Sequence, residues 1–160
     1  MSTATHDSRT TVNQYCSFWV AGLFFGVDVA EVQEVLRTQP MTPVPRASEA
    51  VRGLINLRGQ IVTAVDMRVR LGLPPRPEGT LPMNVIVRSR GEVVSLLVDD
   101  IGDVIDTAGL EIEPAPSNLP ESVKEVIDGV RPLPEAILLV LDADRAVDVT
   151  TVPEPPGGNP

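Results

Sequence analysis

Short apolar runs separated by turn residues recur along the chain and predict a protein built mainly from strands. Three pairs of these runs flank a short turn that contains glycine, which is the pattern of a β-hairpin. The predicted hairpins are Tyr15–Val20 with Leu23–Val27, Val51–Leu57 with Gln60–Val65, and Asn84–Arg88 with Val93–Val98. Further strands are predicted at Ile101–Ile105, Val126–Arg131 and Ile137–Leu141.

Three segments follow a helical pattern instead. From Asp28, a favourable N-cap, the run V-A-E-V-Q-E-V-L-R predicts an amphipathic helix of about two to three turns, with Glu34 away from its apolar face. The residues that share the apolar face at spacings of three and four are Val29, Val32, Val35 and Leu36. One or two helical turns are predicted after Asp66, and a short helix from Asp142 through Val147.

The predicted strands form two groups, separated near residue 80 by the proline-rich stretch Pro74–Pro82. About ten strands with three short helices indicate an all-β fold, and the two groups favour two small β-barrels over one sandwich. An earlier proline-rich segment, with Pro40, Pro43 and Pro45, should stay extended at an edge. Residues 1–11 and 150–160 are expected to be disordered, which leaves one ordered domain over residues 12–149.

Composition narrows the possible partners and the cellular compartment. The net charge is −9 and Lys124 is the only lysine, which disfavours nucleic acid or an anionic lipid surface as a partner. Cys16 is the only cysteine, so the chain forms no internal disulfide, as is usual in a reducing cytosol. The longest apolar run is too short to span a bilayer. We therefore expect a soluble, cytoplasmic protein that does not insert into the membrane.

The residues of common reaction centres are scarce. His6 is the only histidine and lies in the polar N-terminus, so neither a catalytic triad nor a Cys/His zinc site can be assembled with Cys16. No glycine-rich loop of the phosphate-binding kind stands between a strand and a helix. The sequence therefore predicts that the protein is not an enzyme and carries no cofactor or metal.

One acidic stretch leaves an alternative open. The run V-D-D-I-G-D-V-I-D could bind Mg²⁺ or supply paired carboxylates through Asp99, Asp100, Asp103 and Asp106. Strand alternation explains the same run without a metal, with the aspartates in turns or facing outward. The residues expected to be buried in that arrangement are Val98, Ile101, Val104 and Ile105. We favour the strand interpretation.

Arg58 occupies the turn of the predicted hairpin Val51–Val65, and Glu34 lies in the segment before it. Both could be ordinary solvated charges, and an exposed pair of this kind contributes only ~0–1 kcal/mol. Alternatively, an arginine at a hairpin tip near a glutamate organises a docking surface, because guanidinium offers five directional donors. The residues alone leave both interpretations open.

Several motifs resemble the CheW family, the coupling proteins of bacterial chemotaxis arrays. The run V-Q-E-V-L is followed by R-G-L-I-N-L-R-G-Q-I-V and then by V-D-M-R. Later pieces that are similar to the family are V-V-S-L-L-V-D-D-I-G-D-V-I, the connector I-E-P-A-P and the close I-D-G-V-R-P-L-P-E-A-I-L-L-V-L-D. The resemblance covers about Val12 to Val149, and N-L-R-G with its flanks is its most specific part.

The resemblance implies two five-stranded SH3-like barrels packed around a shared hydrophobic centre, and a non-enzymatic adaptor role. Family members bind the cytoplasmic tip of methyl-accepting chemoreceptors and the regulatory domain of the histidine kinase CheA, and are recruited to membrane-associated receptor arrays. The positions that fall on the family's receptor-docking region are Val32, Glu34, Gly53, Arg58 and Val104. For Gly53, close approach of a partner helix and relief of a strand bulge are equally good interpretations.

The chain also departs from the family pattern. Ser95 and Asp100 stand where many relatives carry glycine, Ala64 stands where proline is common, and the final helix is short. These differences bear on the contact with the kinase rather than on the fold. Two alternatives stay open: a coupling protein of a receptor–kinase pathway other than motility, and a small metal-binding β-barrel protein that uses the Asp99–Asp106 stretch.

Overall fold

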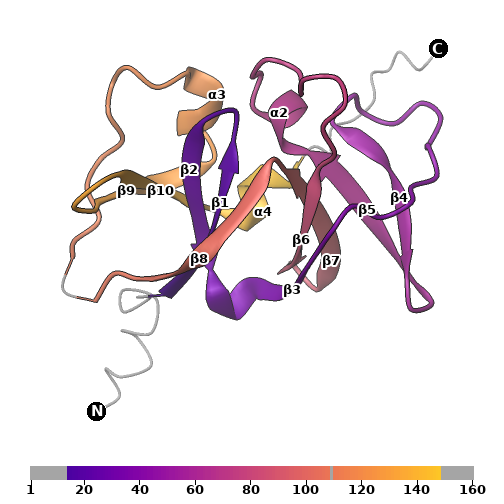
Figure 1. Cartoon of the computed structure of the whole chain (residues 1–160), viewed down its shortest axis with the longest axis horizontal. Helices are drawn as coiled ribbons and strands as arrows, with labels where there is room; N and C mark the ends of the chain where they lie inside the picture. Colours follow the sequence, from indigo (N-terminus) through magenta and orange to yellow (C-terminus); the bar gives the residue numbers. More distant parts are fainter. Residues whose placement is uncertain (1–13, 109, 149–160) are drawn as a thin grey trace.

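The computed structural model describes residues 14–108 and 110–148, and it is built from two five-stranded sheets and four short helices (Figure 1). This confirms the predicted all-β fold class. The strands are β1 Gln14–Val20, β2 Leu23–Asp28, β3 Val32–Leu36, β4 Val51–Leu57, β5 Gln60–Asp66, β6 Met83–Ser89, β7 Glu92–Val98, β8 Asp100–Asp106, β9 Ile127–Pro132 and β10 Ile137–Leu141. The helices are η1 Val29–Glu31, α2 Met67–Arg70, α3 Glu121–Lys124 and α4 Ala143–Ala146. The ends that were predicted to be disordered lie outside the described residues.

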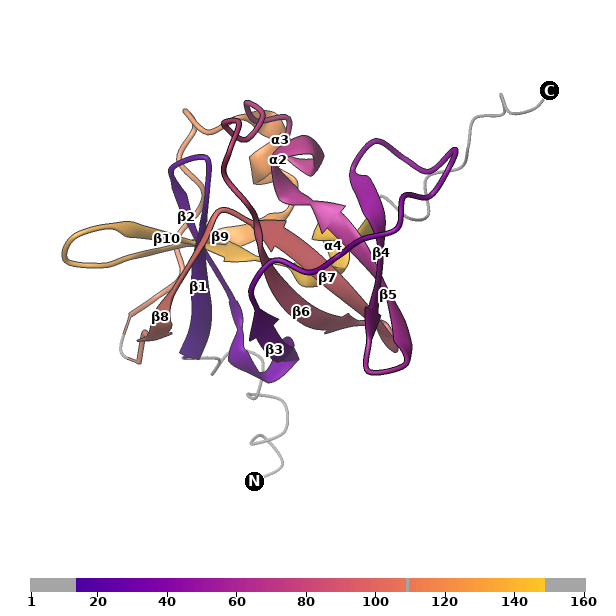
Figure 2. The ribbon, with the colours of Figure 1, turned by 45° about the vertical axis from the view of Figure 1, so that its right-hand side comes forward.

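The sequence predicted that the two groups of strands divide near residue 80, and this prediction is wrong. Sheet 1 has the strand order β8-β1-β2-β10-β9, and sheet 2 has the order β3-β6-β7-β5-β4. The chain therefore starts in sheet 1, crosses to sheet 2 at η1, and returns to sheet 1 after β7; both views show the two sheets side by side (Figures 1 and 2). The stretch Pro74–Pro82 connects α2 to β6 inside sheet 2, so its prolines mark a loop and not a domain boundary.

The prediction of a helix of two to three turns after Asp28 is also wrong beyond the first turn. Asp28 does cap a helix, since its Oδ1 accepts a hydrogen bond of 2.9 Å from the Ala30 N–H, but that helix ends at Glu31. The following residues form β3, antiparallel to β6, with Val35 opposite Val85. Valines spaced three apart fit the helical period, but their β-branched side chains favour the strand once β6 offers an edge.

The three predicted hairpins are confirmed, and their turns share one backbone geometry. The two turn residues have positive φ in every case: 51° and 85° at Ala21-Gly22, 53° and 90° at Arg58-Gly59, and 53° and 82° at Arg90-Gly91. Two consecutive positive φ values define a type I′ turn, whose twist matches that of the flanking strands. Each X-Gly dipeptide therefore sets the register of its hairpin.

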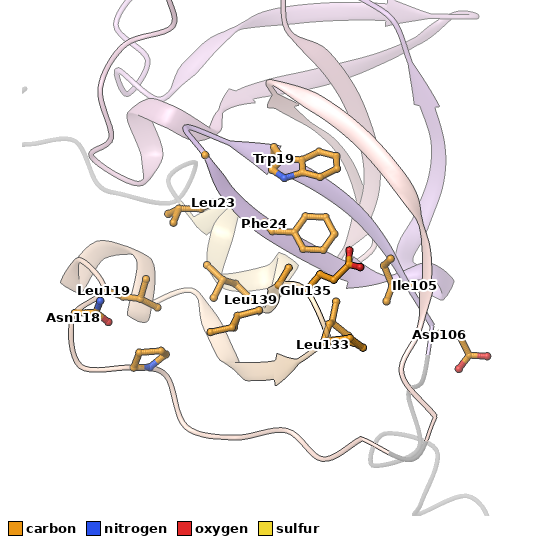
Figure 3. A pocket seen from close by; sticks show the side chains of 15 residues that line it. Trp19, Leu23, Phe24, Ile105, Asp106, Asn118, Leu119, Leu133, Glu135 and Leu139 are labelled. Atoms are coloured by element: carbon orange, nitrogen blue, oxygen red, sulfur yellow. The ribbon is translucent and has the colours of Figure 1, made fainter.

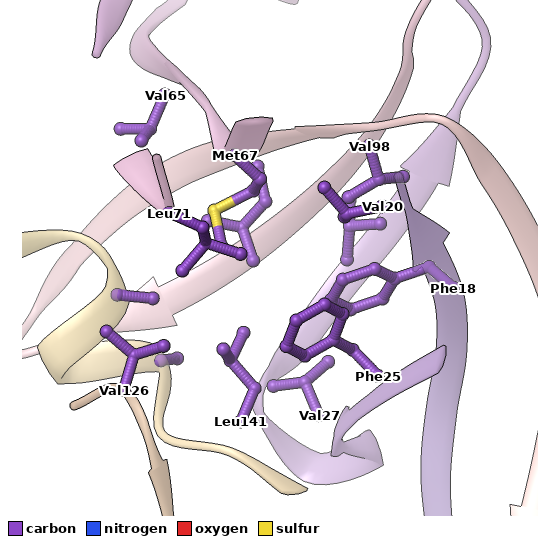
Figure 4. Packing of buried hydrophobic residues seen from close by; sticks show 14 of the residues in the cluster. Phe18, Val20, Phe25, Val27, Val65, Met67, Leu71, Val98, Val126 and Leu141 are labelled. Atoms are coloured by element: carbon purple, nitrogen blue, oxygen red, sulfur yellow. The ribbon is translucent and has the colours of Figure 1, made fainter. Parts of the chain in front are cut away.

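A shared hydrophobic centre packs the two sheets against each other, as the resemblance implied. Phe18 and Phe25 of sheet 1 stack with ring centroids 5.7 Å apart, and Met67 of α2 and Leu71, just after this helix, reach the same cluster (Figure 4). A second cluster around Ile55 fills the interior of sheet 2. A third, smaller cluster joins sheet 1 residues, with Tyr15, Leu138 and Val140 at its core.

The two helices predicted after Asp66 and Asp142 are confirmed, and each aspartate caps its helix. Asp66 Oδ1 accepts a 3.0 Å hydrogen bond from the Arg68 N–H, and Asp142 Oδ1 accepts one of 3.2 Å from the Arg145 N–H. These caps satisfy backbone donors that have no partner inside the helix. The sequence analysis missed α3, a single turn that begins after Pro120 and has no side-chain cap.

Candidate functional site

Arg58 lies at the tip of the β4–β5 hairpin and pairs with Glu34 on β3 through a hydrogen-bonded ion pair. Asn56 stabilises the turn, because its Oδ1 accepts a 2.9 Å hydrogen bond from the Gly59 N–H. This contact was missed in the sequence, although an asparagine three residues before the glycine of N-L-R-G was its signal. The turn thus presents a fixed guanidinium at the surface.

The Glu34–Arg58 pair joins the two ends of one sheet. In sheet 2, β3 is one edge strand and the β4–β5 hairpin forms the other edge, so the pair links elements that are not neighbours in the sheet order. Leu36 and Met41 pack against the interior cluster around Ile55 from the same side. A contact between both edges closes the sheet toward a barrel, and here that contact is an ion pair whose Arg58 side chain is exposed.

Gly53 lies buried in β4, and the chain's own backbone explains why it is a glycine. A Cβ at this position would lie 2.7 Å from the carbonyl oxygen of Thr42, which is too close for any side chain. Thr42 forms an isolated bridge with Leu54, through hydrogen bonds of 2.9 and 2.8 Å. The pairing of β4 with β5 also shifts register between Val51 and Gly53. Close approach and a bulge therefore both occur, but the approaching chain is the protein's own.

The other two predicted docking residues lie on different sheets. Val32 begins β3, faces Val87 across the ladder and packs partly against the shared centre. Val104 belongs to β8 in sheet 1, opposite Cys16, and is 55% exposed instead of buried as strand alternation predicted. The structure therefore joins Glu34 to Arg58 directly, keeps Val32 on the same strand as Glu34, and leaves Val104 on the other sheet.

The acidic stretch from Asp99 to Asp106 is explained by local bonding. The two carboxylate oxygens of Asp99 accept hydrogen bonds from Arg68 Nε at 3.0 Å and Nη2 at 2.6 Å, and Oδ2 also accepts one of 2.7 Å from the Ala21 N–H. Burial pushes the pKa of Asp99 upward, but these hydrogen bonds outweigh it and hold the pKa below its usual value. The carboxylates of Asp100 and Asp106 accept hydrogen bonds from nearby backbone N–H groups. Within residues 14–108 and 110–148, no group of three or more metal-ligating side chains comes together.

An apolar groove of about 850 Å³ opens on sheet 1, away from the Arg58 hairpin (Figure 3). Trp19 and Phe24 project into it from the β1–β2 hairpin with ring centroids 4.8 Å apart, and Leu133 and Leu139 lie below them in that view. All five aromatic residues of the chain lie between positions 15 and 25, and two of them, Trp19 and Phe24, line this groove. Its lining is mainly apolar, and its polar side-chain groups are those of Asp106, Asn118 and Glu135 and the Trp19 indole N–H, as is typical of a ligand pocket.

The helices of the described part of the chain are single turns, and none has the length and apolar character to cross a membrane.

The fold and the site first define a class of protein: two small barrels around one hydrophobic centre, with no cluster of metal-ligating side chains among the described residues. The chain belongs to the CheW-like domain family, whose pattern matches residues 14–150. The resemblance noted in the sequence is therefore confirmed. Members of this family are non-enzymatic scaffolds of chemotaxis signalling, so the protein is a chemotaxis scaffold or adaptor and not an enzyme.

Curated relatives and a solved structure agree with this placement. The chain is 28% identical over 144 residues to "Chemotaxis protein CheW" of Rhizobium meliloti, covering 90% of this chain and 93% of that protein. It is 30% identical over 131 residues to "Chemotaxis protein CheW" of Bacillus subtilis, covering 82% of this chain and 84% of the relative. The solved scaffolding protein TtCheW of Thermoanaerobacter tengcongensis superposes with a TM-score of 0.72 at 26% identity, covering 81% of this chain and 88% of TtCheW.

Proposed function

We propose that this protein couples chemoreceptors to a CheA-type histidine kinase, by binding the cytoplasmic tip of the receptor and the regulatory domain of the kinase. It acts in the cytoplasm and is recruited to receptor arrays at the membrane. Membership in a family of chemotaxis scaffolds supports this role. No chemical step is needed: the adaptor holds its partners in one geometry, and a change in the receptor shifts the kinase between two states.

The receptor-docking region in this proposal comprises Val32, Glu34, Gly53, Arg58 and Val104. The single observation that carries it is the exposed Glu34–Arg58 pair at the closure of sheet 2. Glu34 occupies part of the guanidinium, and the remaining donors of Arg58 are available to carbonyl or carboxylate oxygens of a receptor helix. Gly53 contributes indirectly, because it lets the Thr42 segment lie against β4 next to the hairpin.

A pull-down from the organism's own lysate, with Arg58→Glu beside the wild type, tests the proposal. The substitution places a second acid opposite Glu34 at an exposed site, where losing the pair costs only ~0–1 kcal/mol of stability. A central arginine of an interface carries about 2 kcal/mol or more of binding energy, so receptor recovery should fall by about tenfold or more. Kinase activation in a reconstituted assay should fall with it.

Arg90→Glu is a matched control, because Arg90 occupies the same type I′ turn position in the β6–β7 hairpin. The two arginines share a φ of 53°, and their side chains are 67% and 63% exposed. Arg90 pairs with Asp144 and not with β3, so its reversal should leave receptor recovery unchanged. Wild-type recovery and activation with Arg58→Glu would refute the docking region. The receptor that is captured also separates a motility pathway from another receptor–kinase pathway.

A further inference from the structure

A small cleft of about 260 Å³ lies where the chain leaves β7 of sheet 2 for β8 of sheet 1. It is separate from the Arg58 hairpin and from the apolar groove of sheet 1, and none of the residues in the proposed docking region lines it. Its lining combines arginines, aspartates and an exposed leucine, from α2, the loop between α2 and β6, and the β7–β8 junction.

Arg76 lines the cleft and lies near two aspartates, Asp66 and Asp99, each of which already has another arginine as a closer partner. Asp99 is held at both oxygens by Arg68, and Asp66 by Arg52 Nη2 at 2.6 Å. Arg76 lies farther away, with Nη1 3.8 Å from Asp66 and Nη2 3.6 Å from Asp99. These distances give ionic attraction without hydrogen bonds. Of these three arginines, Arg76 is therefore the one that has no hydrogen bond to either carboxylate.

The guanidinium of Arg76 is also incompletely bonded. Its side chain is only 12% exposed, and its Nε and Nη2 are buried without a hydrogen-bond partner. A buried N–H group of a charged side chain is costly when it is left without an acceptor. Nε and Nη2 form one edge of the guanidinium, and this edge matches the two oxygens of a carboxylate in a bidentate pair.

We propose that this cleft binds a carboxylate, with Arg76 as the residue that receives it. Arg76 lines the cleft, and binding requires its side chain to rotate, because Nε and Nη2 are buried in the present conformation. Asp100 at the rim disfavours a dianion such as phosphate, which carries more charge than Arg76 can neutralise. Leu81, 70% exposed, supplies an apolar wall, and the volume suits only a small ligand. The expected group is a monocarboxylate with a short apolar body, either a free organic acid or a glutamate side chain of a protein partner.

Nuclear magnetic resonance of the arginine Nε–H groups in the full chain tests this site directly. The probes are sodium propionate, N-acetyl-glutamate methylamide and sodium phosphate, each balanced with sodium chloride to constant ionic strength. The Arg76 Nε–H signal, identified by its loss in Arg76→Lys, should shift saturably with the two carboxylates and far less with phosphate. The preferred source is the free acid or the peptide side chain, whichever of these two probes binds more tightly.

Arg76→Lys keeps the charge but loses the two-donor edge, so the dissociation constant measured by calorimetry should rise by about tenfold or more. Arg90→Lys, on an exposed arginine elsewhere, should leave it unchanged. The proposal fails if the wild-type Nε–H signal does not saturate with either carboxylate, because a trapped water then satisfies the cleft. It also fails if chloride and carboxylates act alike, because the site then takes an adventitious ion only. The wild-type signal decides the question even where a variant does not fold.

Discussion

Gly53 shows how one missing side chain positions a surface. Its Cα faces the backbone of Thr42, and the two hydrogen bonds between Thr42 and Leu54 tie the segment before β4 to that strand. Because the contact is backbone to backbone, no rotation of a side chain can relieve an added Cβ. The position therefore tolerates glycine alone, for a reason that belongs to the fold and holds with or without a receptor.

Gly53→Ala should lower the free energy of unfolding by about 1–3 kcal/mol, the usual cost of overpacking a well-packed site. Urea unfolding gives this value, and amide hydrogen exchange at Leu54 should speed up because its bond to the Thr42 carbonyl is disturbed. Gly59→Ala is a useful contrast: nothing lies near its Cβ, but its φ of 90° strains alanine. That variant should destabilise the turn while leaving exchange at Leu54 unchanged. Equal exchange in Gly53→Ala and the wild type would contradict the steric explanation.

At the residue scale, the positions of charged residues could be predicted from the sequence more readily than the residues with which they form ion pairs. Arg58 could be placed at a hairpin tip because Arg-Gly separates two apolar runs, and its meeting with Glu34 was one of two open interpretations until the structure joined them. Arg76 could not be found, because its incomplete bonding depends on two aspartates, Asp66 and Asp99, that come from separate strands of sheet 2 or their ends.

At the element scale, β3 is held to sheet 2 by a buried polar contact as well as by its ladder. The side chain of Asn84 on β6 donates a 3.0 Å hydrogen bond from Nδ2 to the Arg37 carbonyl, at the end of β3. Its Oδ1 accepts a 2.7 Å hydrogen bond from Ser95 of β7, and both side chains are buried. Ser95 is thus a partner for Asn84 across the sheet.

Asn84→Ala should cost about 1–3 kcal/mol of stability, because it leaves the buried Ser95 hydroxyl and the partly buried Arg37 carbonyl without this partner. Urea unfolding monitored by Trp19 fluorescence would measure the loss. Asn118→Ala, at an exposed asparagine, should cost far less. If the two variants unfold at the same urea concentration, Asn84 does not anchor β3 in the way described.

The elements that the sequence predicted correctly are those with a local signal. The three hairpins carry X-Gly turns, and α2 and α4 carry aspartate caps. The β3 segment has apolar residues that fit either a strand or a helix, and only the edge of β6 decides between them. Helix α3 has neither a cap nor enough length to show a period.

At the scale of the whole molecule, acidic groups from three regions converge where the chain first crosses between the sheets. Glu31 of η1 lies at the surface near Asp28 and near Asp128, Asp142 and Asp144 of the C-terminal elements. Partial burial, and then the repulsion from these four carboxylates, raise the pKa of Glu31 to about 7 from an ordinary value of 4.5. Arg145 offsets part of the repulsion, through contacts of 2.6 Å to Asp128 and 3.1 Å to Asp142.

Because the folded protein binds this proton more tightly than the unfolded chain, neutral Glu31 stabilises the fold. The contribution is complete below about pH 4.5 and is lost as the pH rises through about 7. Glu31→Gln should therefore be stabilised relative to the wild type above about pH 7, and this advantage should disappear near pH 4.5. Urea unfolding of both proteins across this range measures the difference. Salt at about 0.5 M should shrink it, since exposed charges are screened. A difference independent of pH would contradict the assignment.

The arrangement of the whole molecule was the hardest part to predict from the sequence. A fold of two barrels was predicted because the strands fall in two groups along the chain, but the assignment of strands to sheets depends on pairs that are far apart in the chain. β8 joins β1, and β10 lies parallel to β2. Neither pairing leaves a local signal, whereas the prolines of the loop 74–82 gave a misleading one.

Because the chain crosses between the sheets, the two sheets can be completed only one after the other during synthesis. When β7 leaves the ribosome, all five strands of sheet 2 exist, but sheet 1 has only β1 and β2. Phe18 and Phe25 of the β1–β2 hairpin therefore lack part of their cover until the strands β9 and β10 are synthesised. The first residues to emerge are thus among the last to be enclosed, and sheet 2 serves as the template on which sheet 1 is completed.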